Sequence, residues 1–136
     1  MTGVAMLKEF VICIIIIISI IFGNYQTQNY TKDSVRTLVN ELGGLRKEIF
    51  KEDNKVDEEN VKDKMEKVLE EWESRHDKLA YFIEHDELEK VETSLTEIRS
   101  YVDTGEYKDS ISELDKGEFL LKHIEEKYAF TLKNIF

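Results

Sequence analysis

The hydrophobic residues of this chain form one continuous run, which is followed by apolar positions at regular intervals. Nineteen positions, 4–22, are uncharged except for Lys8 and Glu9. As an α-helix, this run is about 28 Å long, close to the roughly 30 Å hydrocarbon core of a bilayer. We therefore expect residues 1–23 to form an N-terminal transmembrane helix that contacts the membrane through residues 4–22.

An uncleaved signal anchor explains this run better than a cleaved signal peptide or a buried strand. Cleavage requires small residues after the run, but bulky Ile21 and Tyr25 occupy candidate positions. Five consecutive isoleucines suit a β-strand, yet no partner strand is evident. Basic residues are nearly balanced across the run, and short N-terminal tails usually stay in the cytoplasm. We expect a single-pass protein of the cell membrane, with a cytoplasmic N-terminus and an extracytoplasmic C-terminal domain.

Beyond the run, apolar residues recur at steps of three and four, the spacing of one face of an α-helix. A polar stretch, 24–31, is interpreted as a juxtamembrane spacer, unless the first helix continues through it. The pattern then predicts helices over about 32–51, 57–84, 86–104 and 106–128. Short connections favour antiparallel neighbours. The predicted fold is all-α: a transmembrane helix followed, in residues 32–128, by a small antiparallel helical bundle of two helix hairpins.

Several positions are expected to define the core and the helix ends. The apolar stripes place four residues in the core, namely Trp72, Leu95, Leu114 and Ile124. Gly43-Gly44 lies inside the first helix of the bundle, where glycine is unfavourable, and predicts a kink or a close helix crossing. Gly105 follows the third helix, where a left-handed terminal residue is expected.

The last eight residues, 129–136, form an apolar C-terminal tail. We expect the tail to dock on the bundle through Asn134, Ile135 and Phe136, because burying two large apolar side chains is favourable. The alternative is a peptide that a partner protein captures.

Charge and composition narrow the classes of function. The 136 residues include 29 Asp and Glu against 19 Lys and Arg, a formal net charge of −10. This acidity argues against nucleic-acid binding, which needs a basic surface. One cysteine can form neither an internal disulfide nor a cysteine-based zinc site.

The three histidines are the main candidates for chemistry. Glu73 and His76 match half of a carboxylate di-iron site, but the required second Glu-x-x-His does not occur at His85 or His123. We therefore expect no metal and no other cofactor, and we place His76 at the core boundary beside Trp72.

The segment His85-Asp86-Glu87 is expected to form a corner between helices, with Asp86 as the N-cap of the third bundle helix. His85 is then a turn residue. No nucleophile motif or phosphate-binding glycine loop occurs in the sequence. We therefore expect that the protein is not an enzyme.

An ordered set of residues resembles a known family. The set comprises Trp72, His85-Asp86-Glu87-Leu88, Leu95, Glu113-Leu114, His123-Ile124 and the terminal Asn134-Ile135-Phe136. With the N-terminal anchor, it resembles the bacterial domain-of-unknown-function family numbered four-three-six-three, small single-pass proteins with a helical domain outside the membrane. The resemblance covers nearly the whole chain and implies a bacterial envelope location without an assigned activity. Its candidate interaction or corner residues are His85, Glu87, His123, Asn134, Ile135 and Phe136.

These observations favour a membrane-anchored protein-interaction or scaffold module of the bacterial cell envelope, whose protein partner the sequence does not identify. Two alternatives stay open. One is an extracytoplasmic ligand-sensing bundle, although such sensors normally carry a second membrane span. The other is an elongated bitopic coiled coil, in which the helix after the anchor pairs between chains. A homo-oligomer is compatible with the pattern, but Gly43-Gly44 and three predicted corners disfavour a long coiled coil.

Overall fold

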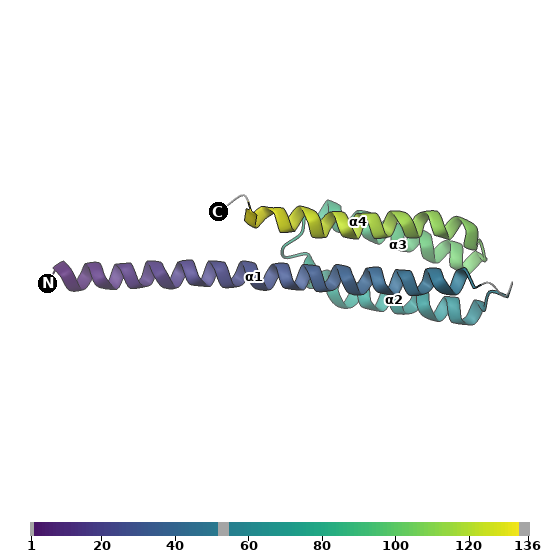
Figure 1. Ribbon diagram of the computed structural model, residues 1–136, viewed down its shortest axis with the longest axis horizontal. Coiled ribbons are helices and arrows are strands. Elements are labelled where there is room, and N and C mark those ends of the chain that lie inside the picture. The colour runs from purple at the N-terminus through teal and green to yellow at the C-terminus, as the bar shows by residue number, and fades with distance from the viewer. Residues whose placement is uncertain (1, 52–54, 134–136) are drawn as a thin grey trace. The chain divides into compact units, whose positions relative to one another are not determined.

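Helices make up nearly all of the chain that is described. A computed structural model describes residues 2–51 and 55–133, which contain four helices and no strand (Figure 1). The chain divides into two compact units, Met1–Tyr30 and Thr31–Phe136. The helices are α1 (Thr2–Ile49), α2 (Glu58–Leu79), α3 (His85–Thr104) and α4 (Tyr107–Lys133). The prediction of an all-α chain, with a long apolar helix ahead of a helical bundle, is confirmed.

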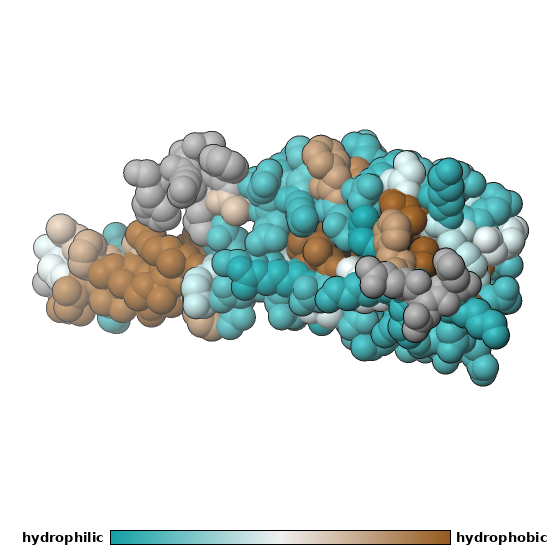
Figure 2. Space-filling model, turned by 45° about the vertical axis from the view of Figure 1, so that its right-hand side comes forward, coloured by the Kyte–Doolittle hydropathy of each residue, from teal (hydrophilic) through white to brown (hydrophobic). Residues whose placement is uncertain are grey.

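The first unit is the N-terminal part of α1, and its surface is strongly apolar (Figure 2). Every large apolar side chain in positions 4–22 is exposed. The helix is long and apolar enough to cross a membrane, a property that an N-terminal signal sequence would share. Helix α1 has no break after this segment, so residues 24–31 are helical. The spacer is therefore a continuation of the apolar helix.

The second unit is a four-helix bundle formed by Thr31–Ile49 of α1 together with α2, α3 and α4. Helix α3 packs against both α2 and α4. Helix α1 is joined to α2 by an ion pair between Glu41 and Lys67 at 3.0 Å. It is joined to α4 by Arg46, which lies 3.5 Å from Glu118. Each helix thus has two neighbours around a common core.

The core consists of the apolar stripes that the sequence pattern predicts. Trp72 is 4% exposed, and Leu95, Leu114 and Ile124 are 2% exposed or less. Fully burying one such side chain contributes about 1.5–3 kcal/mol relative to leaving it in water. The other buried apolar residues are Val35, Leu38, Leu42, Leu45, Ile49, Val61, Met65, Val68, Leu79, Ile83, Leu88, Val91, Ile98, Val102 and Leu121.

Local hydrogen bonds define two of the helix ends. The carboxylate of Asp57 accepts a hydrogen bond from the backbone N–H of Asn60 at 3.2 Å and caps the start of α2. At the end of α3, Gly105 adopts a left-handed φ of 73°, which glycine reaches without steric cost. The N–H groups of Gly105 and Glu106 donate to the carbonyls of Val102 and Tyr101, the pattern of a Schellman motif. The expectation for Gly105 is confirmed.

The prediction of a close helix crossing at Gly43-Gly44 is wrong. Helix α1 continues through both glycines, and a Cβ atom at either position would have no neighbouring atom within 4 Å. The tight contact lies instead at Gly117 of α4. A Cβ atom there would be 3.3 Å from Oγ of Ser94 on α3.

Helix α2 ends earlier than the predicted residue 84. The helix stops at Leu79, and the chain then turns through residues 80–83. In this turn, the N–H of Ala80 donates to the His76 carbonyl, and the N–H of Ile83 donates to the Leu79 carbonyl. The predicted N-cap of α3, Asp86, is also wrong. His85 is the first helical residue and Glu84 is the N-cap, without a capping bond from its side chain.

Helix α4 extends beyond the predicted end at Tyr128. It continues to Lys133, since no glycine or proline interrupts the segment, so residues 129–133 are helical rather than a separate tail. The predicted docking of Asn134, Ile135 and Phe136 falls outside the described residues.

Candidate functional site

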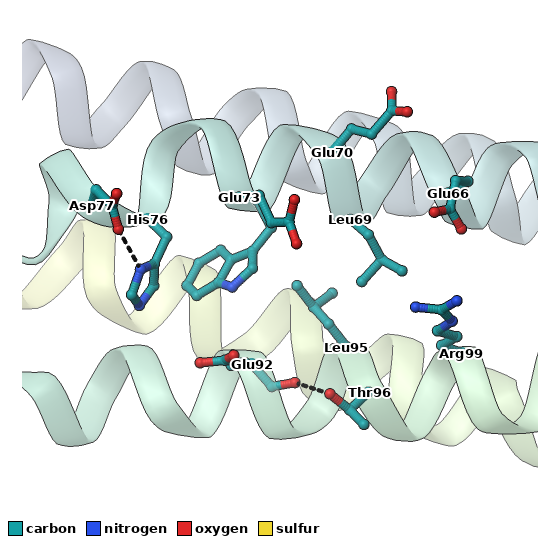
Figure 3. Close-up of a pocket in the computed structure, with 11 residues that line it drawn as sticks. Glu66, Leu69, Glu70, Glu73, His76, Asp77, Glu92, Leu95, Thr96 and Arg99 are labelled. Carbon is teal, nitrogen blue, oxygen red and sulfur yellow. Dashed lines mark hydrogen bonds and ion pairs between the residues drawn. The ribbon is translucent and has the colours of Figure 1, made fainter.

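A groove of about 490 Å³ lies between α2 and α3 on the surface of the bundle (Figure 3). Leu69 of α2 and Leu95 of α3 point toward one another inside it. Trp72 also lines the groove, and both Trp72 and Leu95 belong to the core. The bottom of the groove is therefore apolar and is held by well-packed side chains.

The walls of the groove are acidic. Four carboxylate residues of α2 line it at intervals of four, three and four positions, which places them along one side of the helix: Glu66, Glu70, Glu73 and Asp77. Glu92 of α3 lies across from Glu73 (Figure 3). Arg99 is the one lysine or arginine among the described lining residues, and it is 3.7 Å from Asp103. Like charges at such spacings repel, so a bound cation would relieve an unfavourable field.

Most of these carboxylates lack a counter-ion of their own. Within the described part of the chain, Glu66, Glu70, Glu73 and Glu92 form no ion pair, and all four are exposed. Asp77 lies beside His76, with 3.3 Å between Oδ1 and Nδ1. The groove therefore presents negative charge that no lysine or arginine neutralises directly.

Trp72, which lines the groove, carries a hydrogen-bond donor that no described residue accepts. Its ring packs against that of His76, with the centroids 5.4 Å apart and the planes at 59°, which agrees with the predicted position of His76 at the core boundary. Among the described residues, the indole Nε1–H has no acceptor, although it keeps some contact with solvent. Because buried indoles usually have a partner and Trp72 lines the groove, this N–H can donate to a ligand there.

Arg75 fixes the other side of α2 against α1. Its guanidinium donates to Asp33 at 3.0 Å, to Ser34 Oγ at 3.2 Å and to Glu71 at 3.1 Å. Burial alone would lower the pKa of Arg75, but the hydrogen bonds to Asp33 and Glu71 raise it. The side chain therefore stays charged, and α2 presents the groove from a fixed position.

A second polar cluster joins the start of α3 to α4. Glu87 is largely buried, and Nζ of Lys127 lies 3.3 Å from its carboxylate and 3.3 Å from that of Glu84. Burial opposes the charge of Glu87, but the hydrogen bond from Lys127 and the nearby Lys90 lower its pKa. The backbone N–H of Glu84 donates to the hydroxyl of Tyr128 at 2.8 Å. These bonds hold the corner that the sequence predicted near residues 85–87.

The structure brings together some of the predicted candidate residues and separates others. His123 lies near enough to Glu87 to be among the groups that lower the pKa of that carboxylate, and its ring stacks on Phe119 with the centroids 6.2 Å apart. His85 is exposed, and its side chain makes no hydrogen bond or ion pair with the described residues. Asn134, Ile135 and Phe136 lie outside the described residues.

The groove itself was not predicted from the sequence, although a signal for it exists. The acidic residues at 66, 70, 73 and 77 share one side of a helix that also carries Trp72. Glu73 and His76 do line one groove, but the described residues contain no group of three His, Cys, Asp or Glu side chains placed to hold a metal ion. The arrangement is suited to binding a cationic group that also offers a hydrogen-bond acceptor.

Comparison with known proteins places the chain in a family. No curated protein and no solved structure matches it. The family model described as "Domain of unknown function (DUF4363)" matches residues 25–135, which include the groove and all four helices of the bundle. The match begins just after the apolar run and confirms the resemblance found in the sequence. The chain therefore belongs to the DUF4363 family.

Proposed function

We propose that this protein is a membrane-anchored interaction module of the bacterial cell envelope, whose bundle binds a protein partner through the groove between α2 and α3. The observation that carries the proposal is the contrast between the two units. The apolar side chains of the first unit are exposed, whereas the apolar stripes of the bundle are buried within the chain. A bundle with its own core can fold without the partner that it binds.

The exposed apolar surface supports the membrane part of the proposal. Soluble proteins rarely expose contiguous apolar patches larger than a few hundred Å², and larger ones mark membrane or protein contacts. We propose that the helix is an uncleaved signal anchor, with the N-terminus in the cytoplasm and the bundle outside it.

A binding role is favoured over the alternative of a coiled coil between chains. The stripe that such a coiled coil would use is buried within the bundle, as Leu38, Leu42 and Leu45 are fully buried.

A non-catalytic role is part of the proposal. In the described residues, the hydroxyls of Ser74 and Ser110 donate to backbone carbonyls, and no serine is hydrogen-bonded to a histidine base.

The test combines topology with site-specific cross-linking in intact membranes. A reporter that is active only outside the cytoplasm is fused after Phe136. A photo-cross-linking amino acid replaces Glu73 in the groove or, as a matched control, Glu126, which is also an exposed glutamate but lies on α4. We expect an active reporter, a mature protein that retains Cys13, and a discrete cross-linked protein adduct at position 73 that is missing at position 126.

Four results would contradict the proposal, two for its topology and two for its binding surface. An inactive reporter, which would show that the C-terminus is in the cytoplasm, or a mature N-terminus near Gly23, would refute the anchored topology. Equal adducts at positions 73 and 126, or none at either, would refute the groove as the binding surface. A ligand-sensing bundle would instead give no protein adduct, and a small molecule that binds it would protect it from unfolding.

A further inference from the structure

The groove also indicates the chemistry of what it binds. Building on the proposed function, we infer that it takes an extended, basic peptide segment of the partner protein. The lysine or arginine side chains of this segment pair with the groove carboxylates, above all Glu73 and Glu92. One of its backbone carbonyls accepts the indole N–H of Trp72.

Charge complementarity is the first argument for a basic segment. Five carboxylate residues and one arginine line the groove, and Glu66, Glu70, Glu73 and Glu92 have no ion pair elsewhere in the described chain. Some other acidic residues of the bundle join helices, as Asp33 does with Arg75 and Glu41 with Lys67. The groove carboxylates have no such structural role. Opposite charge on a ligand would steer it to this surface and fix its position.

The indole N–H of Trp72 is the second, independent argument. Trp72 is 4% exposed and lines the groove, and its N–H, which keeps contact with solvent, has no acceptor among the described residues. A bound helix would offer few acceptors, since its carbonyls are used within the helix. An extended segment keeps its carbonyls free to accept. The indole therefore favours an extended backbone over a helical one.

The spacing of the carboxylates fits an extended segment. From Glu66 to Asp77, α2 rises by about 16 Å, with the carboxylate residues about 4.5–6 Å apart along the axis. In an extended peptide, every second side chain points the same way, at intervals of about 6.8 Å. Basic residues at alternate positions would therefore lie close to successive carboxylates. A second copy of this acidic chain, with a net charge of −10, would be repelled.

The single tryptophan makes binding directly observable. Trp72 is the only tryptophan of the chain, so tryptophan emission of the folded protein reports on the surroundings of one residue that lines the groove. The probe is a capped octapeptide of alternating lysine and serine, titrated into the full chain in micelles of a zwitterionic detergent, which carry no net charge and no tryptophan. We expect a saturable change in Trp72 emission that weakens as salt screens the charges. The same peptide with glutamate in place of lysine should cause no change.

Matched variants separate the groove from the general acidity of the chain. The pair Glu73→Lys and Glu92→Lys should weaken peptide binding by about ten-fold or more. The control pair Asp109→Lys and Glu126→Lys makes the same change in net charge at exposed positions of α4 and should weaken it by less than about two-fold. With a fluorescein-labelled peptide, Trp72→Phe keeps an aromatic ring, removes the N–H and should weaken binding by about three- to ten-fold.

Three outcomes would overturn the inference: an unchanged Trp72 emission with the basic peptide, equal loss of binding in the groove and control pairs, or spermine binding as tightly as the peptide. Spermine carries several positive charges but no carbonyl, so equal affinity would mean that the groove takes any polycation. Failure of peptide binding would leave the topology and cross-linking results standing. If the peptide binds but the reporter is inactive, only the proposed topology would be refuted.

Discussion

Replacing glycine by alanine inside the helices should have different effects at Gly44 and at Gly117. Gly44 lies within α1, and a Cβ atom there would meet nothing within 4 Å. Gly44→Ala therefore gains helix propensity at no steric cost, and should stabilise the bundle by about 1 kcal/mol. For a domain of this size, the melting temperature should rise by about 4–8 °C.

The same change at Gly117 meets a crowded contact between α3 and α4. The new methyl group would lie 3.3 Å from Ser94 Oγ, 3.6 Å from Ile98 Cδ1 and 3.7 Å from Leu42 Cδ1. Ser94 is fully buried, and its hydroxyl donates to the Glu113 carbonyl at 3.2 Å, so it has little freedom to move away. Overpacking a core typically costs about 1–3 kcal/mol, which offsets or exceeds the gain in helix propensity. We expect Gly117→Ala to be neutral or destabilising by about 1 kcal/mol.

The assay is urea unfolding of the full chain, followed by Trp72 fluorescence and by circular dichroism. A double-mutant cycle with Ser94→Ala identifies the cause. Removing the hydroxyl relieves the contact, so Gly117→Ala should be more favourable by about 1 kcal/mol in the Ser94→Ala background. Equal stabilisation at Gly44 and Gly117, or additivity in the cycle, would refute the tight contact between α3 and α4.

Two further predictions concern the core and the corner of the bundle. Trp72→Ala should destabilise the bundle by about 3–5 kcal/mol in urea unfolding followed by circular dichroism, and a loss near zero would contradict its place in the core. Glu87→Gln should lower stability near neutral pH by about 1 kcal/mol, because Lys127 loses its charged partner. Since the folded pKa of Glu87 lies below its ordinary value of 4.5, this difference should be full at pH 7 and vanish as the pH falls through the folded pKa. Glu126→Gln, at an exposed position, is the control.

The helices and the core could be predicted because both depend on a periodic signal. Val35, Leu38 and Leu42 repeat at the spacing of one helix face, and all three are buried. Gly105 could be placed because a left-handed C-terminal residue is a local requirement. Such features are determined within a few residues of the chain, so the sequence pattern is sufficient.

The helix start at His85 and the crossing at Gly117 could not be predicted in the same way. The N–H groups of Glu87 and Leu88 donate to the carbonyl of Glu84, so the helix has already begun before Asp86, which lies inside its first turn. The N–H of Glu84 in turn donates to the hydroxyl of Tyr128, a residue of α4. From the sequence, Gly117 indicates only a position of low helix propensity. Its tight contact becomes evident when the fold places Ser94 opposite to it. In both cases the fold adds a contact with a residue distant in sequence, which a local pattern does not show.

The negative charge of the groove depends on which carboxylates form ion pairs within the bundle. The net charge of the chain does not show this pairing. Five basic side chains form ion pairs between helices, namely Arg46, Arg75, Lys67, Lys116 and Lys127. These pairs neutralise carboxylates at the contacts between α1 and α2, α1 and α4, and α3 and α4. The contact between α2 and α3 has no such pair among the described residues that line the groove, so its carboxylates stay unneutralised. The contact between α2 and α3 is thus lined by carboxylates without a paired cation, and a basic partner would supply the neutralisation that the other contacts obtain from within the chain.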